Sequence, residues 1–108
     1  MNKSKAADPY DFVPKLKKLR DDVLYGDVWE QPELSKRDRS LITCAMLAAL
    51  YRPQELESHM RIAMTNGVTQ DELRGLIIHV AFYAGWPCAI NAGRIAATAF
   101  SDKKTPKS

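Results

Sequence analysis

An apolar run from Leu41 to Leu50 restricts the fold of this chain more than any other segment, because it holds no charged residue. Ser35 ahead of it is a good helix N-cap, and Asp38 lies where a first-turn carboxylate complements the helix dipole. The segment predicts a helix to about Tyr51 that is apolar on all sides and must be covered almost all round. One small domain has few elements for that cover, so the run also predicts contact with identical subunits.

Four other segments carry helical periodicity together with start or stop signals, such as the capping-box sequence of Thr69 and Glu72. No segment alternates polar and apolar residues over the length of a strand. The sequence therefore predicts an all-α fold of about five helices. They run from Pro9 to a stop at Gly26, from Ser35 to about Tyr51, from Pro53 to a stop at Asn66-Gly67, from Thr69 to Tyr83, and from Pro87 to about Phe100, with a loop over residues 26–34.

The 108 residues fit a single domain, since domains commonly run to about 100–150 residues. We expect its core to cover about residues 29–98. The polar segments 1–8 and 103–108 are expected to be flexible and to carry no chemistry.

The net charge of +3 first suggests nucleic-acid binding, but its distribution argues against it. Residues 1–25 carry six basic and four acidic side chains, residues 26–100 carry seven and eight, and residues 101–108 carry three and one. A near-neutral body with basic ends has no basic face to follow a phosphate backbone. We expect no nucleic-acid partner.

Neither membrane insertion nor secretion is expected. The longest apolar run is far below the ~20 residues that cross a bilayer. The amino end carries Lys3, Lys5, Asp8 and Asp11 without the apolar core of a secretory signal. The sequence predicts a cytoplasmic protein.

The two cysteines, Cys44 and Cys88, are far apart and each lies among apolar residues. Their spacing matches neither a zinc knuckle nor a CxxC redox pair, and two small buried thiols are the simpler interpretation. A pairing through the fold stays open. The two histidines are twenty residues apart without an obvious third ligand, so no metal is expected.

His59, Glu55 and His79 are the candidate catalytic residues. Glu55 precedes His59 by four positions, so the two side chains share a helix face, where a carboxylate can orient an imidazole for proton transfer. A solvated helix pair is the alternative. His79 lies between Ile78 and Val80 and can serve either as a second donor or as a hydrogen-bonded core histidine.

Four residues are candidates for substrate binding: Arg39, Arg52, Tyr83 and Trp86. A guanidinium can hold a substrate carboxylate through two hydrogen bonds, although a surface or interface salt bridge is the alternative for either arginine. The two aromatic residues flank the helix break at Gly85, where they can wall a pocket or simply pack. The chain has no nucleophile elbow, phosphate loop or dinucleotide fingerprint.

Four motifs in a fixed order resemble the carboxymuconolactone decarboxylase family, over roughly residues 29–98. They are Arg37-Asp38-Arg39-Ser40-Leu41-Ile42-Thr43, Glu55-Leu56-x-x-His59, Asn66-Gly67-Val68-Thr69 with Glu72, and His79-Val80-Ala81-Phe82-Tyr83-Ala84-Gly85-Trp86-Pro87. The resemblance implies an all-helical subunit in a ring-like homo-oligomer, a trimer or a hexamer, with pockets at subunit contacts.

The resemblance extends to alkylhydroperoxidase D-like proteins, which carry Cys-x-x-Cys-x-x-x-His. If His59 is that histidine, Arg52 and Glu55 occupy the two thiol positions. Neither residue can act as a thiolate nucleophile or a resolving thiol. A peroxidase-like reaction would need Cys44 and Cys88 to meet in the fold, and it stays an alternative here.

The family resemblance implies a cofactor-independent carboxy-lyase that acts on a small anionic lactone or carboxylic acid. The family's named reaction removes carbon dioxide from carboxymuconolactone, in aromatic breakdown toward 3-oxoadipate. Here His59 would be the general acid/base oriented by Glu55, with His79 as a second donor and Arg39 or Arg52 on a carboxylate. A non-catalytic oligomer that binds a small acid is the remaining alternative.

Overall fold

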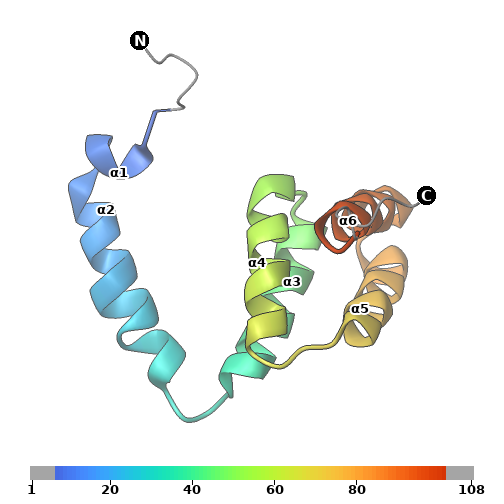
Figure 1. Ribbon diagram of the computed structural model, residues 1–108, viewed down its shortest axis with the longest axis horizontal. Helices are drawn as coiled ribbons and strands as arrows, with labels where there is room; N and C mark the ends of the chain where they lie inside the picture. Colours follow the sequence, from blue (N-terminus) through green and yellow to red (C-terminus); the bar gives the residue numbers. More distant parts are fainter. Residues whose placement is uncertain (1–6, 102–108) are drawn as a thin grey trace. The chain divides into compact units, whose positions relative to one another are not determined.

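The computed structural model describes residues 7–101, and within that range it contains helices and no strand. The all-α prediction is confirmed. The chain forms two compact units, one up to Glu33 and one from Leu34 onward, each described here by itself. The expectations for residues 1–6 and 103–108 lie outside the described residues, and the single-domain prediction stays a prediction. The helices are α1 Pro9–Phe12, α2 Pro14–Leu19, η1 Arg20–Tyr25, η2 Val28–Glu30, α3 Lys36–Ala49, α4 Pro53–Thr65, α5 Gln70–Tyr83 and α6 Trp86–Ala99 (Figure 1).

In the first unit, the predicted continuous helix from Pro9 is interrupted at Val13. Asp8 caps α1 by accepting a hydrogen bond from the backbone of Tyr10. Val13 then leaves the helical region, with φ −128° and ψ 76°, because the ring of Pro14 restricts the residue before it. Helix α2 restarts there and continues as the π-helical η1, a wider coil that the apolar spacing did not reveal.

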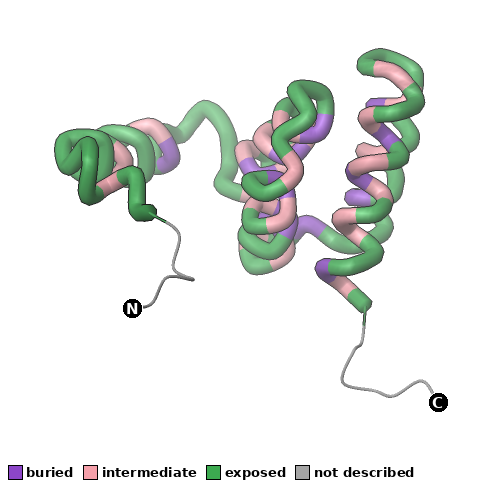
Figure 2. The backbone as a smooth tube through the Cα atoms, turned by 90° about the horizontal axis from the view of Figure 1, so that it is seen from above, coloured by how far each residue is buried: buried purple, intermediate pink, exposed green. Residues whose placement is uncertain are grey.

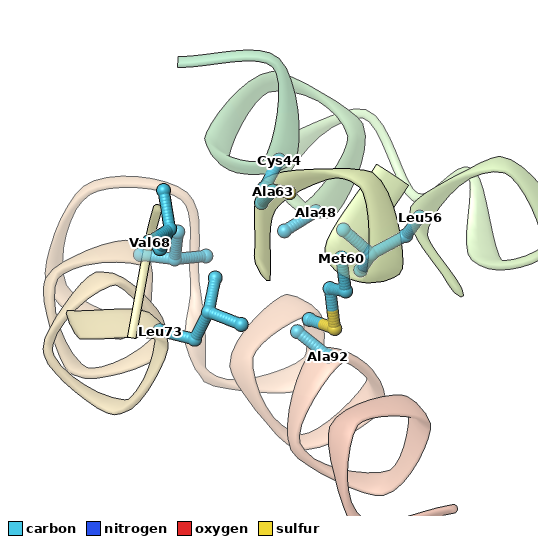
Figure 3. Close-up of a cluster of buried hydrophobic side chains, with 9 residues drawn as sticks. Cys44, Ala48, Leu56, Met60, Ala63, Val68, Leu73 and Ala92 are labelled. Carbon is cyan, nitrogen blue, oxygen red and sulfur yellow. The ribbon is translucent and has the colours of Figure 1, made fainter. Parts of the chain in front are cut away.

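The second unit is built from α3, α4, α5 and α6. Helix α3 packs against the other three, and α6 packs against both α4 and α5. The side chains between them form one apolar core, most of which Figure 3 labels. Its buried members are Cys44, Ala48, Leu56, Met60, Ala63, Val68, Leu73, Val80 and Ala92.

Helix boundaries in this unit follow the capping residues. The Ser35 hydroxyl accepts from the backbone of Asp38, and Thr69 and Glu72 form the complete capping box. Gly67 and Gly85 have φ of +102° and +110°, a conformation that glycine adopts without the steric cost of a Cβ. The predicted starts and stops of these four helices are confirmed to within about two residues, the usual uncertainty of helix ends.

Two polar contacts hold the start of α3 against the segment between α4 and α5. The Arg37 guanidinium pairs with the Glu72 carboxylate, which also receives the backbone N–H of Thr69. The Asn66 amide donates to the fully buried Ser40 hydroxyl at 2.9 Å. These side chains belong to the resemblance motifs, and their contacts here are structural.

Among the described residues of the second unit, the apolar helix α3 has one buried face and one exposed face. Cys44 and Ala48 are fully buried, whereas Met46 is 53% and Leu50 62% exposed. Figure 2 shows this separation of buried and exposed positions on the helices of the unit. The prediction that identical subunits cover the remaining face stays a prediction.

Candidate active site

His59 lies on α4 at the edge of the buried face formed by Leu56, Met60 and Ala63. Its ring is partly buried, and its Nδ1 atom is buried without a hydrogen-bond partner. A buried ring nitrogen without a partner is unusual in a folded protein, since burying a polar group without a hydrogen bond is costly. The atom therefore has hydrogen-bonding capacity that the described residues do not use.

The charge that acts on His59 comes from its own helix. Burial lowers the pKa of the imidazole below its ordinary 6.5, and the Glu55 carboxylate one turn earlier acts in the opposite direction. Arg52, three residues before Glu55, is exposed at the N-cap of α4. Glu55 and His59 share one face of α4 at i,i+4 spacing, and Arg52 lies just before the helix with a non-helical backbone, φ −116° and ψ 77°.

His79, Tyr83 and Trp86 form a second group, at the end of α5 and the start of α6. The His79 and Tyr83 rings stack with centroids 4.6 Å apart, and Phe82 meets Trp86 edge to face at 6.1 Å. His79 is exposed, so the core-histidine interpretation was wrong. Tyr83 is 81% and Trp86 60% exposed, which also excludes core packing within this chain.

These two groups are not combined in one pocket of the second unit. Helix α4 packs mainly against α3 and α6, and α5 packs mainly against α3 and α6 rather than against α4. Arg39 is separate again, because its Nε donates to the Leu34 carbonyl at 3.2 Å and so holds the chain ahead of α3.

The cysteines lack the environment of a redox centre. Cys44 is fully buried on α3, and burial raises the pKa of its thiol to about 11. Such a thiol is not ionised at neutral pH and is a poor nucleophile. Cys88 lies near the start of α6, with its Sγ 3.6 Å from the Ala49 carbonyl, and both cysteines are free.

Sequence reasoning missed Asn91 on α6. Its side-chain Nδ2 is the second buried polar atom without a partner in the described chain, beside Nδ1 of His59. The signal was an amide in the otherwise apolar stretch Ala89-Ile90-Asn91-Ala92. Without a structure, that amide cannot be told from a hydrogen-bonded core residue.

A groove of about 590 Å³ lies between α5 and α6 and is lined mostly by apolar side chains. None of the predicted site residues lines it. Within residues 7–101 there is also no group of three or more His, Cys, Asp or Glu side chains placed to hold a metal ion, and no helix long and apolar enough to span a membrane. The groove residues are Gln70, Leu73, Arg74, Ile77, Ile78, Gly93, Ala96, Ala97 and Phe100.

Comparison with protein-family models matches residues 14–98 to the carboxymuconolactone decarboxylase family. The chain belongs to this family. The 4-carboxymuconolactone decarboxylase of Acinetobacter baylyi is 46% identical over 78 residues, which are 72% of this chain and 58% of that protein. The nitrosuccinic acid decarboxylase of Metarhizium robertsii is 40% identical over 68 residues, 63% of this chain and 48% of that protein.

The chain thus spans about half the length of the curated relatives that it matches. Both relatives in this family carry a decarboxylase name, and neither name describes a peroxidase. Together with the buried, un-ionised Cys44 thiol, this disfavours the redox alternative.

Proposed function

We propose that this member of the family is a cofactor-independent carboxy-lyase that acts on a small anionic lactone or carboxylic acid, with carboxymuconolactone as the first candidate. The observation that carries the proposal is His59: a partly buried imidazole beside a carboxylate, with an unpaired ring nitrogen. It lies in a chain related to two proteins named as decarboxylases.

The substrates in the relatives' names share the chemistry that such a site can support. Loss of carbon dioxide leaves an electron pair, which a conjugated lactone carbonyl can accept in carboxymuconolactone and a nitro group can accept in nitrosuccinic acid. The substrate is then its own electron sink. The protein has to bind the anion, stabilise the negative charge that develops on oxygen, and supply a proton.

His59 suits the proton transfer, because its surroundings act on its pKa in opposite directions. Burial favours the neutral ring, and Glu55 favours the protonated one. An imidazole whose pKa lies near or below neutrality can release and regain a proton under physiological conditions. In this proposal Glu55 tunes His59 through its charge, and we expect it to orient the ring when substrate is bound.

Arg52 is our first candidate for holding a substrate carboxylate, since it is exposed directly before α4, three residues ahead of Glu55. Arg39 is the weaker candidate, because its guanidinium already donates to the Leu34 carbonyl. We place His79, Tyr83 and Trp86 at the site through a homo-oligomer, a trimer or a hexamer, in which a neighbouring copy presents them.

The test follows carboxymuconolactone turnover by loss of ultraviolet absorbance in native protein and a His59→Gln variant. Glutamine keeps hydrogen-bonding capacity but cannot exchange a proton, so we expect kcat to fall by about 10²-fold or more. The matched control is Gln54→Ala, an exposed change on the same helix that should leave the rate unchanged. A native rate in folded His59→Gln protein contradicts the role of His59. Ligand-dependent melting without turnover by native protein would instead identify a binding protein.

A further inference from the structure

His59 Nδ1 and Asn91 Nδ2 are both buried and both lack a hydrogen-bond partner. Buried polar groups in native proteins are nearly always paired, and an unpaired one lowers stability. Since the two atoms belong to helices that pack against each other, they call for a common explanation.

The position of the two residues follows from the core between α4 and α6. Figure 3 shows the Met60 side chain extending to Ala92 across this contact. His59 and Asn91 directly precede these two residues, so they lie at the level along α4 and α6 where Met60 meets Ala92. The two unpaired nitrogens therefore belong to two helices that pack against each other.

The chemistry of the two groups favours an anionic oxygen as their shared partner. An amide nitrogen carries only hydrogen-bond donors, and an imidazole offers a donor or an acceptor at Nδ1. A neutral amide is also less costly to bury than a guanidinium, so it suits the side of a site where negative charge appears only during the reaction.

We propose that Asn91 is a substrate-binding residue whose Nδ2–H donates to the oxygen that becomes negative as carbon dioxide leaves. This inference rests on the proposed decarboxylase function and adds a residue to its site. In carboxymuconolactone the carbon–carboxylate bond breaks, and its electron pair moves through the conjugated double bond to the lactone carbonyl oxygen. Asn91 holds that oxyanion. A proton from His59 then adds to the ring carbon, and the electron pair returns to re-form the carbonyl.

The decisive variant is Asn91→Leu, which keeps the size of the side chain and removes its donor. We expect kcat to fall by about 10²-fold with little change in KM, as for loss of one oxyanion donor. The melting temperature should stay the same or rise, because an unpaired buried amide is replaced by an apolar group. A structural role for Asn91 predicts a lower melting temperature and is contradicted by this pattern.

Asn91→Asp adds a signature in the pH profile. At neutral pH its carboxylate repels the developing oxyanion, so activity should be low. Protonation at acid pH turns the carboxyl into a donor, and activity relative to native protein should recover as the pH falls. The absence of this recovery, together with a near-native rate in Asn91→Leu, overturns the proposal.

Asn66→Leu is the matched control, because the Asn66 amide already donates to buried Ser40. Replacing it leaves the Ser40 hydroxyl without that partner, so the melting temperature should fall by several degrees, while kcat of the folded protein stays near native. The two asparagines should thus give opposite results in stability and in activity.

If the native protein does not turn over carboxymuconolactone, that compound is excluded as the substrate, and the role of Asn91 has to be tested in another way. Titration with succinate, an unreactive dicarboxylate, then decides it. We expect the NMR signals of the Asn91 side-chain amide and the His59 ring to shift in native protein, and the His59 shift to shrink at least several-fold in Asn91→Leu. Unshifted signals in native protein, or an undiminished His59 shift in the variant, overturn the inference.

Discussion

At the scale of single residues, the pKa of His59 is subject to two opposing effects. Burial disfavours its charged form, and the Glu55 carboxylate favours it. The spacing of Glu55 and His59 was visible in the sequence, but the burial was not. Burial depends on how α4 packs against its neighbours, and periodicity alone cannot give that packing.

Glu55→Gln should lower the pKa of His59 further, because the variant loses the one nearby charge that raises it. The alkaline limb of the pH–rate profile, where His59 loses the proton that it donates, should move to lower pH, as measured by kcat at a series of pH values and by NMR titration of the ring. Glu57→Gln is the control, since Glu57 pairs with Arg61 at 3.0 Å and faces a different partner. An unchanged His59 pKa in Glu55→Gln contradicts the coupling.

The same lowered pKa has a defined effect on stability. The unfolded chain binds a proton at His59 more readily than the folded chain, so the free energy of unfolding rises with pH between the folded pKa and about 6.5. At pH values below the folded pKa, the free energy of unfolding is reduced by the full cost of protonating the partly buried ring. His59→Gln should flatten this part of the curve of melting temperature against pH.

Which other residues belong to the site could be predicted only in part. The sequence identified the pair of Glu55 and His59, because helical spacing is readable along the chain, and it named Arg52 separately as a candidate for binding a carboxylate. It did not identify Asn91, because the burial of its side chain without a partner depends on how the helices pack. It also did not anticipate that Arg39 is held by a backbone carbonyl.

At the scale of elements, local chemistry predicted α3 to α6 well. Ser35, the Thr69–Glu72 capping box and Gly85 act within one turn, so their effects do not depend on the rest of the fold. The amino-terminal helix was predicted less well, because the apolar spacing continues through Val13 while the Pro14 ring does not permit a continuous helix.

Gly75 offers a test of helix α5 that does not involve the site. It lies inside the helix and is exposed, and no atom approaches within 4 Å of the position where a Cβ would be added. Gly75→Ala should therefore raise the free energy of unfolding by about 1 kcal/mol, the helix-propensity difference between the two residues. Chemical denaturation followed by circular dichroism measures the change.

Gly85→Ala is the matched control for that substitution. Its φ of +110° is unfavourable for a residue with a Cβ, so this change should destabilise the protein by at least about 1 kcal/mol. Equal effects of the two substitutions would show that α5 and its end do not have the backbone described here.

At the scale of the whole molecule, large apolar side chains remain exposed on the second unit. They include Ile78 and Phe82, which are 63% and 74% exposed on α5, and Leu50 at the end of α3. Contiguous exposed apolar surface commonly marks a contact with another chain. The second group of candidate site residues, His79, Tyr83 and Trp86, lies on this surface rather than beside His59.

If a neighbouring copy completes the site, the His59→Gln and His79→Gln variants should complement each other. Each variant alone should be nearly inactive, because every site lacks one of the two histidines. When the variants are unfolded and refolded together, some contacts pair an intact His59 from one copy with an intact His79 from another. The mixture should recover a measurable part of the native rate, whereas the separately refolded variants should not.

Light scattering on the same samples supplies the second measurement, with assemblies expected at multiples of 12.2 kDa. Phe82→Glu is the control, because burying a carboxylate in an apolar contact is costly and should dissociate the assembly. Since Phe82 is exposed in the single chain, the variant should still fold. The decarboxylase activity should be lost as the molar mass measured by light scattering falls to that of smaller assemblies. A stable, fully active monomer, or a mixture no more active than its parts, would show instead that His59 and its own helix contacts suffice for the reaction.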